Sequence, residues 1–315
     1  MRIDEDVMHC VCYVGFRRNG KPVIGGTAFF VEFEESSALV VTARHIISMI
    51  RGLDASSPVV LWVGSSSGGI SEVKTDPSDW LTHPDESVDA AVLRRPVPYR
   101  DLGHRCLTRR MFVTDEFIQK YDVGAGDELY FPGLFVRHRG ERRIEPILRQ
   151  GTVAAMPLDP VNTGLGPASV YLAEVRSMGG FSGSPVFVHM DMWRVTPRIS
   201  DDVIDELGEA PAQDSFFGLV HGHYDVKAMM DGGPLDLQDV NMGIAVITPA
   251  QRVRELIELP ELEEMRMNGD KKDLAEAVPT MDFAVDSTIE STANLMGKLL
   301  QVPKDEADEI HRDHQ

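Results

Sequence analysis

Residues 179–186 read Gly-Gly-Phe-Ser-Gly-Ser-Pro-Val, and this stretch decides how the rest of the chain is interpreted. A serine hydroxyl becomes a useful nucleophile when a tight turn exposes it beside a base and backbone N–H groups face the developing oxyanion. Glycine on both sides of Ser182 permits the unusual backbone angles of such a turn. Gly180 and Ser182 are spaced to direct their two N–H groups into one cavity. The stretch therefore predicts a nucleophile turn, with a glycine-rich hairpin corner as the alternative interpretation.

Two upstream segments carry the other groups that a serine nucleophile needs. Residues 40–47, Val-Val-Thr-Ala-Arg-His-Ile-Ile, form a β run that ends in a turn of small residues presenting His45. Residues 83–93 form a polar loop that enters an apolar strand, with Asp89 at the junction. Either residue alone is typical of a structural role. Together with Ser182 they fit one chemistry, in which the serine attacks, His45 takes and returns the proton, and a buried Asp89 stabilises the imidazolium.

The sequence resembles trypsin-like peptidases of the chymotrypsin clan, most closely the bacterial members that lack disulfides. The resemblance covers roughly residues 7–258 and implies two antiparallel β-barrels, a closing C-terminal helix and serine endopeptidase activity on polypeptides. It also implies that His45, Asp89 and Ser182 are catalytic and that the N–H groups of Gly180 and Ser182 form the oxyanion hole. The blocks that carry it are residues 26–31, 42–45, 88–92 and 180–185, with residues 124–133 and 150–153 resembling the opening of the second barrel.

The same resemblance places a substrate pocket around Arg176, Ser177 and His221. Arg176 stands six positions before the nucleophile, where similar enzymes form the floor of the pocket. A buried arginine there needs a carboxylate partner, so the resemblance implies a preference for an acidic or glutamine side chain before the cut bond. The alternative is that Arg176 points outward, or pairs with Glu174 or with an acid of the loop at residues 200–214.

Phe181 departs from the pattern of many secreted members, which carry an aspartate there. That aspartate pairs with a freshly cut N-terminus on activation, and the chain has no Ile-Val-Gly-Gly-like start. The departure implies an enzyme that needs no N-terminal zymogen cleavage.

The pattern of short apolar runs predicts an all-β fold. Up to about residue 250, runs rich in Val, Ile, Leu or Phe alternate with clusters of Gly, Pro, Asp or Ser. We expect two antiparallel six-stranded, trypsin-like β-barrels: residues 1–118, which carry the histidine and aspartate, and residues 119–260, which carry the serine and the closing helix. Thr248 is the expected N-cap of that helix and Pro249 its first residue.

Residues 261–315 are expected to form an acidic C-terminal extension. The Asn-Gly-Asp at residues 268–270 is linker-like, and residues 304–315 are mostly charged or polar. Residues 283–300 are amphipathic and are either a helix that binds a protein partner or part of a solvated, partly disordered tail. The acidic loop at residues 200–214 is expected to be a solvated insertion, with an exosite for a basic partner as the alternative.

Composition excludes several other classes of protein. The formal net charge of −19 argues against nucleic acid as a ligand, and no apolar run approaches the ~20 residues that span a bilayer. No secretory signal is recognised at the start, and three cysteines provide no paired disulfide framework. Cys10 and Cys12 are expected to be buried apolar residues. His221-Gly222-His223 has no third ligand spaced nearby, so a zinc site is not expected there.

These observations predict a cytoplasmic serine endopeptidase without a metal or cofactor. A different class stays open, because catalytically silent members of this fold act as binding modules. In that case the chain would be a peptide-binding module or a scaffold regulated by its tail. Retention of all three triad residues and of Gly180 favours the enzyme.

Overall fold

The computed structural model describes residues 3–34, 37–53, 57–65, 68–98, 103–134, 143–175, 181–191, 194, 213–228 and 238–268. The chain divides into two compact units, Met1–Met281 and Asp282–Gln315. The second unit, with the amphipathic stretch 283–300, lies outside the described residues. None of the described helices has the length and apolar character needed to cross a membrane.

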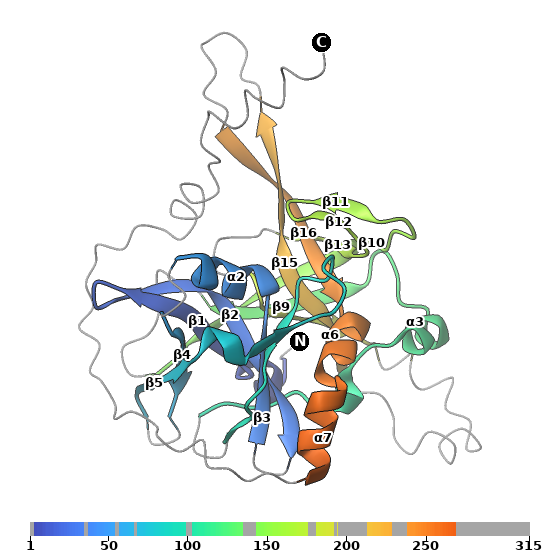
Figure 1. The fold of residues 1–315 in the computed structure, drawn as a ribbon. Coiled ribbons are helices and arrows are strands. Elements are labelled where there is room, and N and C mark those ends of the chain that lie inside the picture. Colours follow the sequence, from blue (N-terminus) through green and yellow to red (C-terminus); the bar gives the residue numbers. More distant parts are fainter. Residues whose placement is uncertain are drawn as a thin grey trace. The chain divides into compact units, whose positions relative to one another are not determined.

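The first half of the chain forms an eight-stranded antiparallel sheet in the order β5-β4-β1-β2-β3-β7-β6, with β8 paired to β3 (Figure 1). The two central strands, β1 (Val11–Arg18) and β2 (Lys21–Glu34), form a hairpin. The other strands are β3 (Ser37–Thr42), β4 (Val59–Gly64), β5 (Ile70–Thr75), β6 (Trp80–Thr82), β7 (Ala91–Leu93) and β8 (Val97–Pro98).

This sheet is a half-barrel within the predicted all-β, trypsin-like fold, with eight strands where six were expected. In the described residues no ladder joins β5 to β6, so the sheet is open. The single turn of 3-10 helix η1 (Pro77–Asp79) separates these strands. Its backbone groups bond elsewhere, because the Arg51 side chain donates to the Pro77 carbonyl over 2.6 Å and the Arg94 N–H donates to the Asp79 carbonyl over 2.8 Å.

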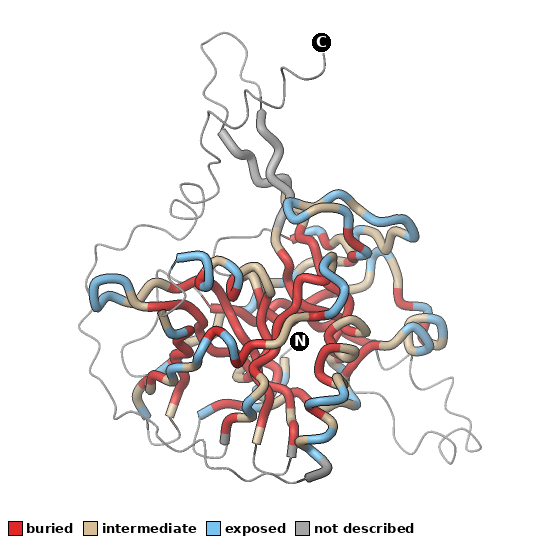
Figure 2. Tube along the Cα trace, in the orientation of Figure 1, coloured by how far each residue is buried: buried red, intermediate tan, exposed pale blue. Residues whose placement is uncertain are grey.

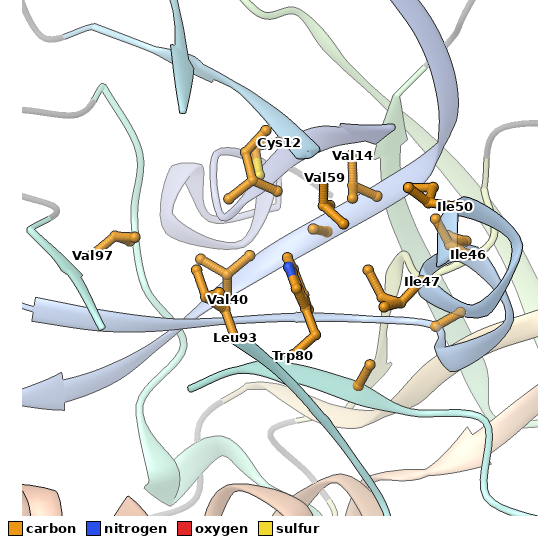
Figure 3. Packing of buried hydrophobic residues seen from close by; sticks show 14 of the residues in the cluster. Cys12, Val14, Val40, Ile46, Ile47, Ile50, Val59, Trp80, Leu93 and Val97 are labelled. Atoms are coloured by element: carbon orange, nitrogen blue, oxygen red, sulfur yellow. The ribbon is translucent and has the colours of Figure 1, made fainter. Parts of the chain in front are cut away.

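Helix α2 (Arg44–Leu53) packs its apolar face into the core of this sheet. Ile46, Ile47 and Ile50 are fully buried with Val14, Val59 and Trp80, as Figure 3 shows. The sequence predicted a turn of small residues that presents His45 and gave no sign of a helix after it, since β-branched residues such as Ile46 and Ile47 are typical of strands. Tertiary burial of three isoleucines on one helical face decides the outcome.

The second half forms a closed six-stranded antiparallel barrel, which confirms that part of the predicted all-β, trypsin-like fold. Its order is β10-β13-β16-β15-β14-β9. A small hairpin of β11 (Val161–Thr163) and β12 (Gly166–Ala168) lies between β10 and β13 in the sequence. The barrel strands are β9 (Glu128–Leu134), β10 (Pro146–Ala155), β13 (Tyr171–Glu174), β14 (Pro185–His189), β15 (Asp214–Ala228) and β16 (Gln238–Pro249).

The closing helix is present, but its start differs from the prediction. Helix α6 (Ala250–Ile257) follows β16 with Pro249 as its N-cap residue and no side-chain cap. Thr248 is still part of β16, and among the described residues its buried hydroxyl has no hydrogen-bond partner. The strand pairing of β15 and β16 runs as far as Pro249, so the helix begins only after that ladder ends.

Three further short helical elements are α1 (Glu5–Met8), η2 (Arg109–Met111) and α3 (Asp115–Tyr121). The expected division at residue 118 therefore falls inside α3. A cluster of phenylalanines joins sheet to barrel at Phe216, whose ring centroid lies 5.3 Å from that of Phe29 and 4.7 Å from that of Phe112. The Val113 N–H also donates to the Phe216 carbonyl over 2.9 Å.

The first residues of the expected extension pack on the folded body. Helix α7 (Pro260–Asn268) follows α6, and Leu262 on it is fully buried. Glu263 forms a 2.9 Å ion pair with Arg109 of η2. Figure 2 shows buried residues (red) concentrated in the strands of both halves, with exposed residues at hairpin tips and in the loops between elements. The linker-like segment predicted at residues 268–270 therefore begins at the end of a docked helix.

Candidate active site

The histidine and aspartate predicted from the sequence lie in direct contact. His45 occupies the first turn of α2, two residues after Ala43, which is the single residue between β3 and α2. Its ring Nδ1 lies 2.7 Å from Asp89 Oδ2, and its backbone N–H donates to Asp89 Oδ1 over 2.8 Å. Because both carboxylate oxygens bond one residue, Asp89 fixes the start of the helix as well as the orientation of the imidazole.

A hydrogen-bonded turn holds Asp89 in place. Asp85 Oδ1 accepts from the backbone N–H and the hydroxyl of Ser87 over 2.9 and 2.8 Å. His83 Nδ1 accepts from the Asp85 N–H over 3.0 Å, and His83 Nε2 lies 3.2 Å from Glu255 Oε2 of α6. The loop that carries the aspartate is therefore attached to the helix that follows the barrel.

Electrostatic attraction between His45 and Asp89 outweighs the cost of burying them. Burial lowers the pKa of His45. The charge of Asp89 and its hydrogen bond together raise it by more, so the pKa ends above its ordinary value. Burial likewise raises the pKa of Asp89, whereas the charge and hydrogen bond of His45 lower it, and the net pKa is lowered. Asp89 is thus an anion that attracts the Nδ1 proton, which leaves Nε2 as the basic nitrogen.

Ser182 lies in a turn that only glycine can complete. Gly183 has φ +83°, and a Cβ on it would lie 2.1 Å from the Thr27 carbonyl oxygen and 2.5 Å from Thr42 Oγ1. Neither the backbone angle nor the space admits a side chain. The Ser184 N–H donates to the Phe181 carbonyl over 2.9 Å and closes the turn around a partly exposed Ser182.

Backbone hydrogen bonds attach this turn to both halves of the fold. The Thr27 N–H of β2 donates to the Ser182 carbonyl over 2.9 Å, and the Gly183 N–H donates to the Val220 carbonyl of β15 over 2.8 Å. Thr42, three residues before His45, donates its hydroxyl to the Thr27 carbonyl over 2.7 Å. These bonds bring the serine turn beside the strand that leads to His45.

Two of the three predicted triad residues, His45 and Asp89, are thus in direct contact, and the turn that carries the third, Ser182, is hydrogen bonded to β2. Within the described ranges, the ring of His45 hydrogen bonds to Asp89 and not to the Ser182 hydroxyl. The exposed fraction of the His45 side chain is 19%, and that of Asp89 is 0%. Catalytic hydrogen bonds are often long or misaligned before substrate binds, so this geometry is compatible with a base and a nucleophile.

Phe181 packs behind the serine turn. Its side chain is buried, and a Cβ on Gly133 of β9 would lie 2.5 Å from its ring. The Arg149 guanidinium lies over the ring, 5.2 Å from its centroid. The residue before Ser182 is thus a buried aromatic side chain, at the position where many secreted trypsin-like enzymes carry the activating aspartate.

His221 of β15 lies against the same aspartate. Its Nδ1 is 3.9 Å from Asp89 Oδ2, and its ring centroid is 6.3 Å from that of His45. The substrate-pocket role expected for His221 stays a prediction, and the observed neighbours are Asp89 and His45. The sequence offered no signal for this contact, because it joins β15 to the loop before β7, two segments that are far apart in the chain.

Several predicted site residues lie outside the described residues. They are Gly180 of the oxyanion hole, Arg176 and Ser177 of the pocket floor, and all of the acidic loop 200–214 except Gln213 and Asp214. The oxyanion hole and the pocket floor therefore stay predictions. In the described part of the chain, no group of three His, Cys, Asp or Glu side chains could hold a metal ion.

No protein-family profile matches the chain, and neither does the sequence of any curated protein. Comparison with solved structures finds the MamO protease domain from Magnetospirillum magneticum at TM-score 0.48 and 15% identity, covering 79% of this chain and 96% of that one. Deg5 matches at TM-score 0.42 and 12% identity, covering 69% and 81%. The inactive Ser343Ala form of Rv3671c from M. tuberculosis H37Rv matches at TM-score 0.42 and 13% identity, covering 79% and 85%. At these scores the likenesses carry no argument about activity, which must rest on the geometry of the site.

Proposed function

We propose that the protein is a serine endopeptidase that hydrolyses peptide bonds through an acyl-enzyme on Ser182. The observation that carries the proposal is the double hydrogen bond from His45 to the buried Asp89, at 2.7 and 2.8 Å, beside the Ser182 turn. A structural histidine needs no buried anion to set its tautomer. A general base does, because the imidazolium must be stabilised while the proton is held.

The proposed reaction assigns one role to each residue. Ser182 Oγ attacks the carbonyl carbon of the substrate while its proton passes to His45 Nε2, and the N–H groups of Gly180 and Ser182 bind the oxyanion. His45 then gives that proton to the leaving amine, which departs as the C–N bond breaks and leaves an ester on Ser182. A water molecule, deprotonated by His45, then attacks the ester, and the acid is released as the bond to Ser182 Oγ breaks and His45 returns the proton to that oxygen.

Labelling with a fluorophosphonate tests the proposal directly. The probe reacts with an activated serine, so the wild-type chain should be labelled and Ser182→Ala should not. Ser184→Ala is a matched control, because this serine is two residues away, is fully buried and, among the described residues, its hydroxyl has no hydrogen-bond partner. Labelling of Ser184→Ala at the wild-type rate is expected.

Two outcomes would contradict the proposal. Labelling that survives Ser182→Ala would place the nucleophile elsewhere. A wild-type chain that folds, binds peptides and is never labelled or turned over would instead support the second candidate, a silent peptide-binding module. In the described structure the Ser182 hydroxyl is not hydrogen bonded to His45, and this observation is why the binding module is tested as a second candidate.

A further inference from the structure

We propose that His221 is a positioning residue for Asp89, which it holds by donating its Nδ1–H to Asp89 Oδ2, the oxygen that also bonds the ring of His45. This inference rests on the proposed function and deepens it, because it assigns the site a second histidine that does not transfer protons.

The geometry leaves Asp89 Oδ2 able to accept a further hydrogen bond. A carboxylate oxygen has two lone pairs, and within the described residues Oδ2 has one bond, from His45. His221 Nδ1 is 3.9 Å away, is buried, and in the described part of the chain has no hydrogen-bond partner. A shift of about 1 Å would bring the pair to the ordinary N–H···O distance.

Leaving these two groups apart is costly. An unpaired N–H in the interior loses its bonds to water, and a further donor stabilises a buried carboxylate beyond the two hydrogen bonds that Asp89 accepts from His45. His221 is 6% exposed and the Asp89 side chain 0%. One hydrogen bond between them satisfies both needs at once.

Burial favours the neutral form of His221. In the described structure, the titratable groups that act on it are Asp89 and His45. Burial lowers the pKa of His221, the charge of Asp89 raises it and the charge of His45 lowers it, and the net pKa is lowered. His45, whose pKa is raised, therefore takes a proton at a higher pH than His221 does. A neutral His221 can hold the aspartate without repelling the imidazolium of His45.

Two substitutions separate this role from simple packing. His221→Leu keeps much of the ring's volume and removes the donor, and we expect kcat to fall about 10-fold or more with KM unchanged. The His45 pKa in the pH profile of kcat/KM should also rise, because a positive dipole beside Asp89 is lost and the unshared carboxylate attracts the His45 proton more strongly. His221→Gln restores a neutral donor and should recover most of both quantities.

His189→Gln is the matched control. His189 is also a buried histidine paired with an aspartate, Asp214 at 2.8 Å, but that pair joins β14 to β15 and does not include the triad residues. The His189→Gln variant should keep kcat and the His45 pKa at their wild-type values.

The result that would overturn the proposal is a His221→Leu variant with wild-type kcat and an unmoved His45 pKa. A change confined to KM and to the side chain preferred before the cut bond would overturn it too, and would support the predicted pocket role instead. Titration of the His45 ring by NMR gives the same pKa without turnover. If the wild-type chain is not labelled by fluorophosphonate, the proposed function fails, and the NMR shift still tests whether His221 acts on Asp89.

Discussion

Asp89 accepts hydrogen bonds from His45 twice, with Oδ2 2.7 Å from the ring Nδ1 and Oδ1 2.8 Å from the backbone nitrogen. The two bonds do different work. The backbone bond anchors the first turn of α2, whereas the ring bond sets the tautomer. A substitution that keeps one and inverts the other can therefore separate folding from activity.

Asp89→Asn is that substitution. Its Oδ1 can still accept from the His45 N–H, but its amide donates toward Nδ1 and forces the proton onto Nε2. Nε2 then cannot accept the proton of Ser182, and we expect kcat to fall by about 10⁴-fold. Thermal unfolding should move by only a few degrees. An Asn variant with near-wild-type turnover would contradict the role assigned to Asp89.

The acid limb of activity should lie above the ordinary histidine range. His45 is active when neutral, and the charge and hydrogen bond of Asp89 raise its pKa above the usual 6.5. Lowering the pH through that raised value protonates the base and removes activity. The half-maximum of kcat/KM on the acid side should thus fall above pH 6.5. A half-maximum well below this pH would mean that burial, and not Asp89, dominates the pKa of His45.

Gly183→Ala should damage the serine turn through a steric clash as well as through its unfavourable backbone angle. Its φ is +83° and its added Cβ would lie 2.1 Å from the Thr27 carbonyl. Gly20 is a matched control, with φ +77° and no atom within 4 Å of an added Cβ. We expect Gly20→Ala to cost about 1–2 kcal/mol of unfolding free energy. Gly183→Ala should cost clearly more and abolish fluorophosphonate labelling. Equal costs in a urea titration would show that the turn adapts to a side chain.

The sequence predicted those parts of the site that depend on local chemistry. The glycine at 183 meets a positive φ, and Asp89 stands where a polar loop meets a buried strand, so both could be recognised from neighbouring residues. The contact between His221 and Asp89 could not, because it depends on how the barrel packs against the sheet. Helix α2 was also missed, since β-branched residues favour strands until tertiary burial of one face decides otherwise.

The start of helix α6 and the closure of the first sheet also depended on contacts that the local sequence does not show. Thr248 before Pro249 is a typical helix start, yet the pairing of β15 with β16 continues through both residues and delays the helix to Ala250. The first sheet was expected to close, but a closed barrel needs a ladder that no local pattern specifies. Long-range hydrogen bonds, and not residue preferences, decided these outcomes.

Truncation will show where the folded body ends. The sequence predicts that the extension begins at residue 261, whereas α7 covers Pro260–Asn268 and buries Leu262 completely. Removing a fully buried leucine from its site costs about 1.5–3 kcal/mol of transfer free energy. The ion pair of Glu263 with Arg109 adds little, because both side chains are partly exposed.

A chain that ends at Leu259 should therefore unfold several degrees below the full-length protein. A chain that ends at Asn268 keeps α7 and should unfold within a few degrees of it, since it removes only residues beyond that helix. Leu262→Ala in the full-length chain is the control for the mechanism, because it deletes the buried side chain and keeps every later residue. If the Leu259 truncation and Leu262→Ala both melt with the full-length protein, α7 contributes nothing to the stability of the body, and the extension begins at residue 261 as the sequence predicted.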